Sequence, residues 1–280
     1  MTMHYKRYFL MGLSSLWPTI ALAQSDDFGV WTSIGAEKDL TKQLSVEAGV
    51  DFRAEDRLES VARWAGSVGL GYKVCRNFKL GVGYVYLYDR ELQEGKVNYN
   101  EEMERNGYNV DHGFGQSKHR FTFDAIGSIK AGRFKFSLRE RYQLTHSLST
   151  DCLRDRYRNA FDPDNAMGYN GPRYEYNGEW FKKKETVTDG KSSKNRHYLR
   201  SRLQVEYNIP KCPFNPFVSY EITNNLENGM DSEKGRLIVG TEYKLTKQHI
   251  FSFGYLFEQG MDGEHEGAKH ILDLGYKFKF

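Results

Sequence analysis

Residues Lys269–Phe280 read KHILDLGYKFKF, and from Leu272 onward apolar and polar side chains alternate without exception. Successive side chains of a β-strand point to opposite faces of the strand. One face of this segment therefore carries leucine, tyrosine and phenylalanine, whereas the other carries aspartate, glycine and lysine. The pattern predicts a strand with one apolar and one polar face that ends on the aromatic residue Phe280.

The same alternation recurs upstream in segments of about ten residues, the length that a tilted strand needs to cross a bilayer. Glu140 is the clearest exception, because it falls on the apolar face of its segment. The pattern predicts an all-β fold, an antiparallel up-and-down transmembrane β-barrel of ten to twelve strands. The upstream segments are Leu44–Arg53, Arg63–Val74, Phe78–Asp89, Arg120–Lys130, Arg133–Leu144, Leu199–Ile209, Val218–Ile222, Arg236–Leu245 and Phe251–Glu258.

The connections between these segments alternate between short and long, as in a chain that passes back and forth through a membrane. The short connections are Glu37–Gln43, Cys75–Asn77, Lys130–Arg133, Pro210–Phe214 and Thr246–Gln248. We expect the short set in the periplasm and the long set outside the cell. The two longest, residues 91–117 and 149–194, are predicted as long extracellular loops; the others are Glu55–Ser60, Asn224–Lys234 and Gly260–Ala268.

The strand count depends on Phe28–Ala36 (FGVWTSIGA), which also alternates and would be an eleventh strand. Single-chain bacterial barrels usually have an even number of strands. Either this segment therefore runs within or beside the lumen, or a twelfth strand lies in a segment that reads as loop. A soluble secreted β-sandwich is the alternative fold, but it does not account for the alternation of short and long connections.

The N-terminus has the form of a signal peptide. Lys6 and Arg7 precede an apolar run, and Ala21-Leu22-Ala23 forms a small-x-small cleavage site. An N-terminal anchor helix is the alternative, but Pro18 interrupts the apolar run. We expect cleavage after Ala23, a single domain over residues 24–280, and a location in the outer membrane of a Gram-negative bacterium.

The composition agrees with a protein that has one apolar and one polar face. Mean hydropathy is −0.70, yet the 280 residues include 19 Tyr and 18 Phe. After residue 23, no stretch approaches the roughly 20 consecutive apolar residues of a helical membrane span. The net charge of +3 gives no reason to expect a nucleic-acid partner.

The polar face should line the barrel interior, where buried charges need partners. One interpretation is a network of ion pairs that fills a narrow barrel. The other is a conduit for a small anionic solute, in which Arg139, Arg141, Arg200 and Arg202 form a basic ladder. The candidate lumen residues are Arg53, Arg63, Arg120, Asp124, Arg139, Arg141, Arg200, Arg202, Glu206 and Glu242.

No motif supports catalysis or metal binding. Thr145-His146-Ser147 invites comparison with an outer-membrane phospholipase, since histidine is the usual base for a serine nucleophile. Adjacent strand residues point to opposite faces, however, so His146 and Ser147 do not pair directly. Glu264–His270 misses the HExxH zinc motif by one position. We therefore expect no enzyme activity, metal ion or cofactor. Cys75 and Cys212 fall in short turns where a disulfide is conceivable, whereas Cys152 lies in the longest loop.

The expected partners follow from the predicted location. The segment 149–194 carries basic and aromatic residues that could contact outer-membrane lipid and lipopolysaccharide. The terminal strand ending at Phe280 resembles the assembly signal by which bacterial barrels engage the barrel-assembly machinery. A channel or a surface-binding role is therefore expected rather than an enzymatic one.

Four motifs resemble a family of Gram-negative outer-membrane barrels known only as a domain of unknown function, DUF2490. They follow the signal peptide and are Asp27–Trp31 (DFGVW), Leu44–Arg53, the pair Arg63-Trp64 and Tyr276–Phe280 (YKFKF). The resemblance covers essentially the whole mature chain and implies a barrel fold and membrane location. It implies no reaction, ligand or catalytic residue.

Overall fold

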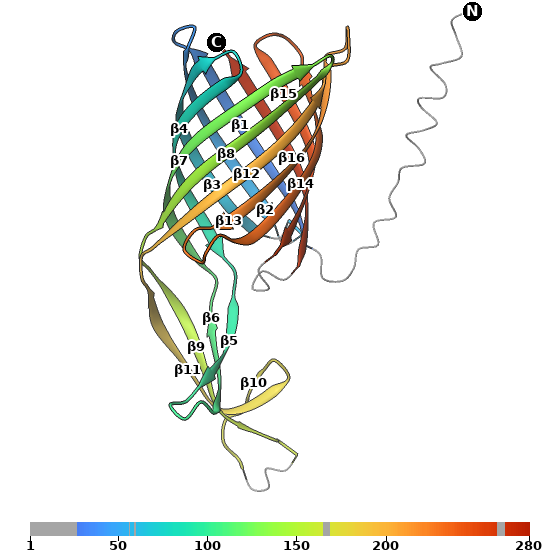
Figure 1. The fold of residues 1–280 in the computed structure, drawn as a ribbon. Coiled ribbons are helices and arrows are strands. Elements are labelled where there is room, and N and C mark those ends of the chain that lie inside the picture. Colours follow the sequence, from blue (N-terminus) through green and yellow to red (C-terminus); the bar gives the residue numbers. More distant parts are fainter. Residues whose placement is uncertain (1–26, 56, 59, 165–168, 262–266) are drawn as a thin grey trace, which may run out of the picture.

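The computed structural model describes residues 27–55, 57–58, 60–164, 169–261 and 267–280, so the predicted cleavage site at Ala23 lies outside the described residues. Within them the chain forms sixteen β-strands. No helix there is long and apolar enough to cross a membrane. The prediction of an all-β barrel is confirmed, because eleven of the strands close into a barrel (Figure 1).

The barrel strands follow one another around the wall in chain order, with two excursions into a second sheet after β4 and β8. Their side chains alternate between the outside and the inside of the barrel. The barrel strands are β1 (Asp27–Asp39), β2 (Leu44–Glu55), β3 (Ser60–Cys75), β4 (Phe78–Glu91), β7 (Phe114–Ala131), β8 (Phe134–Ser147), β12 (Lys194–Tyr207), β13 (Phe214–Asn225), β14 (Asp231–Lys244), β15 (His249–Gly260) and β16 (Ala268–Lys279).

The barrel closes through a parallel pair, which corrects the purely antiparallel arrangement that we predicted. Strand β1 pairs with β16 in parallel register from Asp27↔Lys269 to Glu37↔Lys279, and it pairs with β2 in antiparallel register. An odd number of strands in a meander leaves the first and last strands running in the same direction, so their pairing must be parallel. The segment Phe28–Ala36 is thus an eleventh strand of the wall.

The two ends of the barrel differ in their connections (Figure 1). The short turns and Phe280 lie together at one end, here called the short-turn end. The longer connections and the second sheet lie at the opposite end, here called the long-link end. The alternation read from the sequence therefore corresponds to a real difference between the two ends.

The outer face of the barrel wall is apolar and exposed. Its central part carries aliphatic side chains such as Ile34, Val50 and Val68, which are 59%, 56% and 56% exposed. The inner face carries most of the charged side chains, together with an apolar cluster of Ile238, Leu256, Ile271, Trp31 and Phe217 against the wall of β13–β16 and β1.

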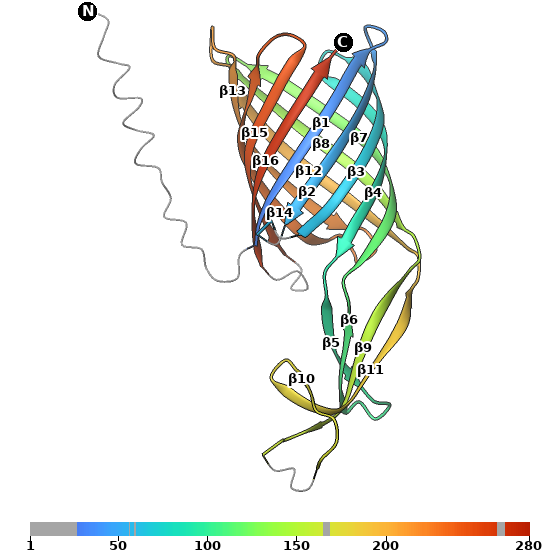
Figure 2. The same ribbon diagram turned by 180° about the vertical axis from the view of Figure 1, so that it is seen from behind.

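The two segments that we predicted as loops, residues 91–117 and 149–194, instead contribute a second, five-stranded sheet, here called the stalk sheet. It projects from the long-link end, as both views show (Figures 1 and 2). Its strand order is β10-β11-β9-β6-β5. These strands are β5 (Glu94–Tyr99), β6 (Arg105–Asp111), β9 (Thr150–Phe161), β10 (Tyr174–Tyr176) and β11 (Glu179–Lys191).

The stalk sheet has its own small aromatic core. Tyr108, Tyr157 and fully buried Phe181 pack together, and Tyr176 covers them from β10. The rings of Tyr108 and Phe181 meet edge to face with centroids 5.9 Å apart. Burial of aromatic surface holds together a sheet that would otherwise be a pair of solvent-exposed hairpins.

Candidate functional site: a basic chamber inside the barrel

A cavity of about 450 Å³ lies inside the barrel, against the wall formed by β2, β3, β4, β7, β8 and β12. Four glycines line it on β3 and β4 at inward positions, namely Gly69, Gly71, Gly81 and Gly83. The opposite wall is filled by the apolar cluster around Trp31. Because glycine has no side chain, these four positions on one wall leave the space open; this cavity is here called the chamber.

The structure brings most of the predicted lumen residues to the chamber. The lining includes Arg53, Arg63, Arg120, Asp124, Arg139, Arg141, Arg200 and Arg202. The other two candidates do not line it: Glu206 pairs with Lys135 at 3.2 Å, and Glu242 lies 3.9 Å from Lys244. Both of these pairs belong to the short-turn end of their strands.

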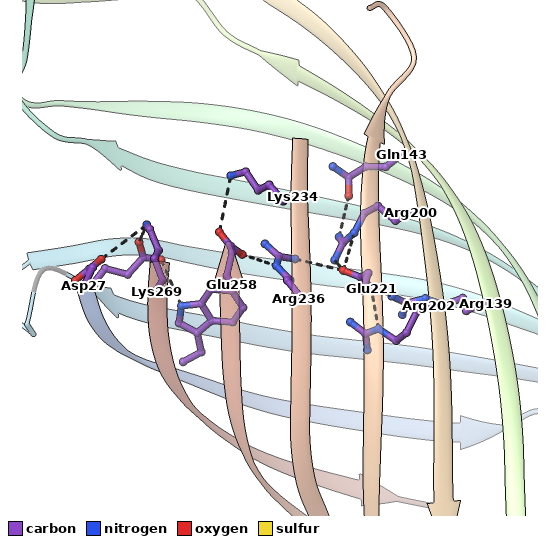
Figure 3. Close-up of polar contacts among 12 residues, drawn as sticks. Asp27, Arg139, Gln143, Arg200, Arg202, Glu221, Lys234, Arg236, Glu258 and Lys269 are labelled. Atoms are coloured by element: carbon purple, nitrogen blue, oxygen red, sulfur yellow. Dashed lines mark hydrogen bonds and ion pairs between the residues drawn. The ribbon is translucent and has the colours of Figure 1, made fainter. Parts of the chain in front are cut away.

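Three of the four arginines that form the basic ladder in one of our two interpretations converge on one carboxylate, Glu221 of β13. Its side chain is 0% exposed. The Glu221 Oε2 accepts hydrogen bonds from Arg139 at 2.7 Å and from Arg202 at 2.8 Å. Its Oε1 accepts from Arg200 and, at 3.4 Å, from Arg236 (Figure 3). One negative charge thus faces four guanidinium groups, which leaves this region electropositive.

The fourth ladder residue, Arg141, binds elsewhere. It forms a bidentate pair with Asp124 of β7, with N–O distances of 2.6 and 2.9 Å. All four arginines of the basic ladder, one of our two interpretations of the lumen, thus bind carboxylates. The ion-pair network that we considered as the other interpretation describes these four residues better.

The network continues around the wall from Glu221. Arg236 also binds Glu258 of β15, which lies 3.9 Å from Lys234 (Figure 3). Beyond it, Lys269 of β16 donates to Glu55 at 2.6 Å. On the facing wall, Arg63 forms a bidentate pair with Asp89. These bonds join adjacent strands, or in the case of Lys269 and Glu55 the two strands on either side of β1, through their inward side chains and stabilise the closed wall.

Two arginines that line the chamber make no ion pair among the described residues. Arg53 stacks its guanidinium on the ring of Trp31, 3.8 Å from the ring centroid. Arg120 donates its Nε to the hydroxyl of Thr145 at 3.2 Å. In addition, the Nε of Arg139 is buried and has no hydrogen-bond partner. The chamber therefore holds cationic donors that the protein itself does not satisfy.

Trp31 is a site residue that we did not predict. The ring lies between Arg53 and Arg236, whose guanidinium is 5.5 Å from the ring centroid, and its Nε1 donates to Glu55 at 3.3 Å. The signal was present in the sequence, because the alternation of Phe28, Val30, Ile34 and Ala36 assigns Trp31 to the inner face. To use this signal, one has to know that the segment Phe28–Ala36 is a strand of the barrel wall.

The histidine and cysteine candidates lie outside the chamber. His146 makes a 2.7 Å hydrogen bond with Asn195 on the outer face, and Ser147 follows it on the opposite face of the strand. Glu264, His265 and Glu266, the first three residues of the segment Glu264–His270, lie outside the described residues. Cys75 and Cys212, the pair for which a disulfide was conceivable, are free.

One acidic cluster in the stalk sheet has the composition of a metal site. The ligand atoms of Asp111, Cys152 and Asp189 lie within 4.8 Å of one another. Arg154 and Lys191 already bind both carboxylates, with Arg154 2.8 Å from Asp189. These bonds neutralise the charge that would attract a metal ion, so the cluster is an ion-pair network.

Comparison with known proteins gives a family but no characterised relative. No curated protein has significant similarity to the sequence. The family model described as "Protein of unknown function (DUF2490)" matches residues 28–266, which include nine complete barrel strands, all but the first residue of β1, and the stalk sheet. The chain therefore belongs to the DUF2490 family of proteins of unknown function.

Proposed function

We propose that this protein spans the outer membrane and that its narrow, basic lumen conducts small anions without catalysing a reaction. The observation that carries the proposal is the chamber, in which Arg53 and Arg120 form no ion pair with a carboxylate of the described residues and Glu221 faces four guanidinium groups. A surplus of fixed positive charge in a confined lumen favours anions over cations.

Two aromatic girdles on the outer face support a position in a membrane. Near the long-link end, Trp64 packs against Tyr86 and Tyr88 with centroids 5.9 and 5.7 Å apart. Near the short-turn end, Phe134 packs against Tyr207 at 4.9 Å. Aromatic girdles at both interfaces are typical of outer-membrane barrels.

The spacing of the girdles fits a bilayer. On β8, Phe134 and Tyr142 are the first and the last outward Phe or Tyr side chains, and about eight residues separate them. At ~3.4 Å per residue and a tilt of 35–45°, this interval covers roughly 20 Å along the barrel axis, close to the ~25 Å apolar band of such barrels. Heat-modifiable gel migration of the protein from an outer-membrane fraction would support this position, and recovery in the soluble fraction would contradict it.

The number of strands makes the conduit narrow. About eight strands leave room only for side chains, whereas sixteen or more enclose an aqueous channel. This barrel has eleven strands, which lies between these limits, and glycines on one side of its interior leave room for a cavity. We expect small conductance steps with anion selectivity rather than a general diffusion pore.

The conduit is tested by filling the chamber. At Gly81 an added Cβ would meet Asp124 at an ordinary contact distance of 3.5 Å, so a larger side chain there fits locally and projects into the chamber. In planar bilayers, Gly81→Leu should lower the unit conductance severalfold. The matched control is Gly127→Leu on β7, where an added Cβ meets nothing within 4 Å on the outer face.

Three outcomes separate the alternatives. Equal conductance of Gly81→Leu and wild type would contradict a path through the chamber. Silence of the wild-type barrel in chloride and phosphate salts would contradict conduction altogether. Hydrolysis of a phospholipid in detergent that is lost in His146→Ala would contradict the absence of catalysis.

The stalk sheet supports a second role, binding at the cell surface. Its strand β11 exposes Lys182 and Lys183 beyond the barrel end, where phosphates of lipopolysaccharide would lie. Replacing both lysines by glutamine should weaken binding to lipopolysaccharide vesicles while the barrel still inserts. Unchanged binding would contradict this role.

A further inference from the structure

We propose that the chamber contains a specific oxyanion-binding site formed by Arg120 and Arg53, which takes a soluble phosphate or carboxylate group. The proposal deepens the anion conduit and rests on it for the route by which a solute reaches the lumen. It goes further in assigning the ligand class and the residues that hold the ligand.

Arg120 is the centre of the site. It projects from β7 into the chamber, where the charges of Arg53, Arg63 and Arg200 act on it and Asp89 opposes them. Arg63 is bound to Asp89, which compensates its charge, whereas Arg200 shares the single charge of Glu221 with three other arginines. Arg120 has only the neutral hydroxyl of Thr145.

Arg53 supplies the second guanidinium from β2. One face of the group is covered by Trp31 at 3.8 Å, which fixes its plane and leaves its N–H edge as the available donor. The nearby carboxylates of Asp51 and Glu55 act on its charge without forming an ion pair with it. Stacking on an aromatic ring is a common way to hold a guanidinium for a ligand.

The cost of holding charged arginines away from bulk water also favours a bound anion. A charge removed from water is costly unless a partner and hydrogen bonds compensate it. Within the described barrel, Arg53 and Arg120 lack such a partner, and Arg139 leaves its Nε unsatisfied in the same wall. An anion in the chamber would satisfy donors that no side chain of the protein reaches.

The donor geometry selects oxyanions over halides. The Nε of Arg120 is occupied by Thr145, so its two terminal nitrogens remain to bind a ligand. A planar guanidinium edge matches two oxygens of a phosphate or carboxylate, whereas chloride offers a single point of contact. Inorganic phosphate and citrate are therefore the probes, with chloride at equal ionic strength as the reference.

The experiment measures phosphate binding to the full-length barrel in detergent by isothermal titration, with heat-modifiable migration as the check that each variant is folded. Wild type should bind phosphate, and Arg120→Gln should weaken binding about tenfold to hundredfold, because it removes charge-assisted hydrogen bonds. The matched control is Lys135→Gln. It removes one positive charge from the barrel interior outside the chamber lining, and it should change the affinity less than about twofold.

A conservative variant keeps the test sharp. Arg120→Lys retains the charge but loses the planar pair of donors, so it should bind phosphate no better than Arg120→Gln does. Equal weakening by Arg120→Gln and Lys135→Gln would overturn the proposal, because the effect would then be general electrostatics. Absence of phosphate and citrate binding to a conducting wild-type barrel would overturn the site and leave the conduit standing. Binding by a barrel that passes no current would support the site and contradict the conduit.

Discussion

Single residues show most clearly which charges the fold can tolerate. Glu140 broke the alternation in the sequence, and the structure places it on the outer face, where the hydroxyl of Ser201 on β12 donates to its Oε2 at 2.6 Å. Within the described strands, Glu140 is the one carboxylate that faces outward between the two aromatic girdles. One hydrogen bond reduces the cost of such a charge without removing it.

Glu140→Leu should therefore stabilise the barrel in a bilayer. Charged side chains on the lipid face of a barrel cost about 2–4 kcal/mol at the midplane for basic residues and less for acidic ones. We expect the free energy of unfolding from phosphatidylcholine vesicles to rise by about 1–2 kcal/mol, measured by urea titration. Ser201→Ala is the control and should lower it by about 1 kcal/mol. A less stable Glu140→Leu variant would argue that this face contacts something other than lipid.

The elements differ in how much of their structure could be predicted. The wall strands were found by their alternation, and the strand count fell within the predicted range. The stalk strands were read as loops, because their two faces are not divided into apolar and polar. On β9, Arg154 and Arg156 share one face, but the other carries Asp155 beside Tyr157. A buried aspartate conceals the pattern that identifies a strand.

The stalk sheet should lose stability in acid. A hydrogen bond from Arg154, aided by Lys191, lowers the pKa of Asp111 to about 2 against the opposing effect of burial. Since the unfolded value is near 3.8, the ion pair contributes fully above about pH 4, and its contribution is lost as the pH falls through 2. The loss should be about 2 kcal/mol.

Proteolysis of the stalk sheet between pH 6 and pH 2 would measure this effect in the detergent-solubilised protein, with an acid-tolerant protease. Asp111→Asn should make proteolysis of the stalk sheet depend less on pH. The part of the pH dependence that comes from Asp155, whose pKa is also about 2, should remain. An unchanged pH profile in Asp111→Asn would contradict the assignment. The barrel should remain heat-modifiable throughout.

On the scale of the whole molecule, eleven strands place the start of β1 and the last residue at opposite ends of the barrel (Figures 1 and 2). The stalk sheet projects from the end at which β1 starts. If the short-turn end faces the periplasm, the stalk sheet reaches beyond the outer surface of the cell.

Epitope insertions test this orientation in intact cells. An epitope at the turn Asn177-Gly178 in the stalk sheet should be accessible to antibody, and one at Gly132 in the β7–β8 turn should be accessible only after the outer membrane is opened. Both positions have positive φ angles in tight turns, and the exposed turns are suited to insertion. The reverse labelling pattern would contradict the proposed orientation.

The sequence by itself determined the apolar and polar faces of the wall strands, because a period of two depends only on local backbone geometry. It also determined which charges point inward. Tertiary structure alone decided how the wall closes and which charges are compensated. The parallel direction of the pair β1–β16 follows from the odd number of strands. Four arginines share Glu221 only because β8, β12, β13 and β14 are consecutive around the wall. The chamber and the two arginines that form no ion pair within the described strands, Arg53 and Arg120, are therefore properties of the closed barrel, since pairing between distant residues is not encoded in any one strand.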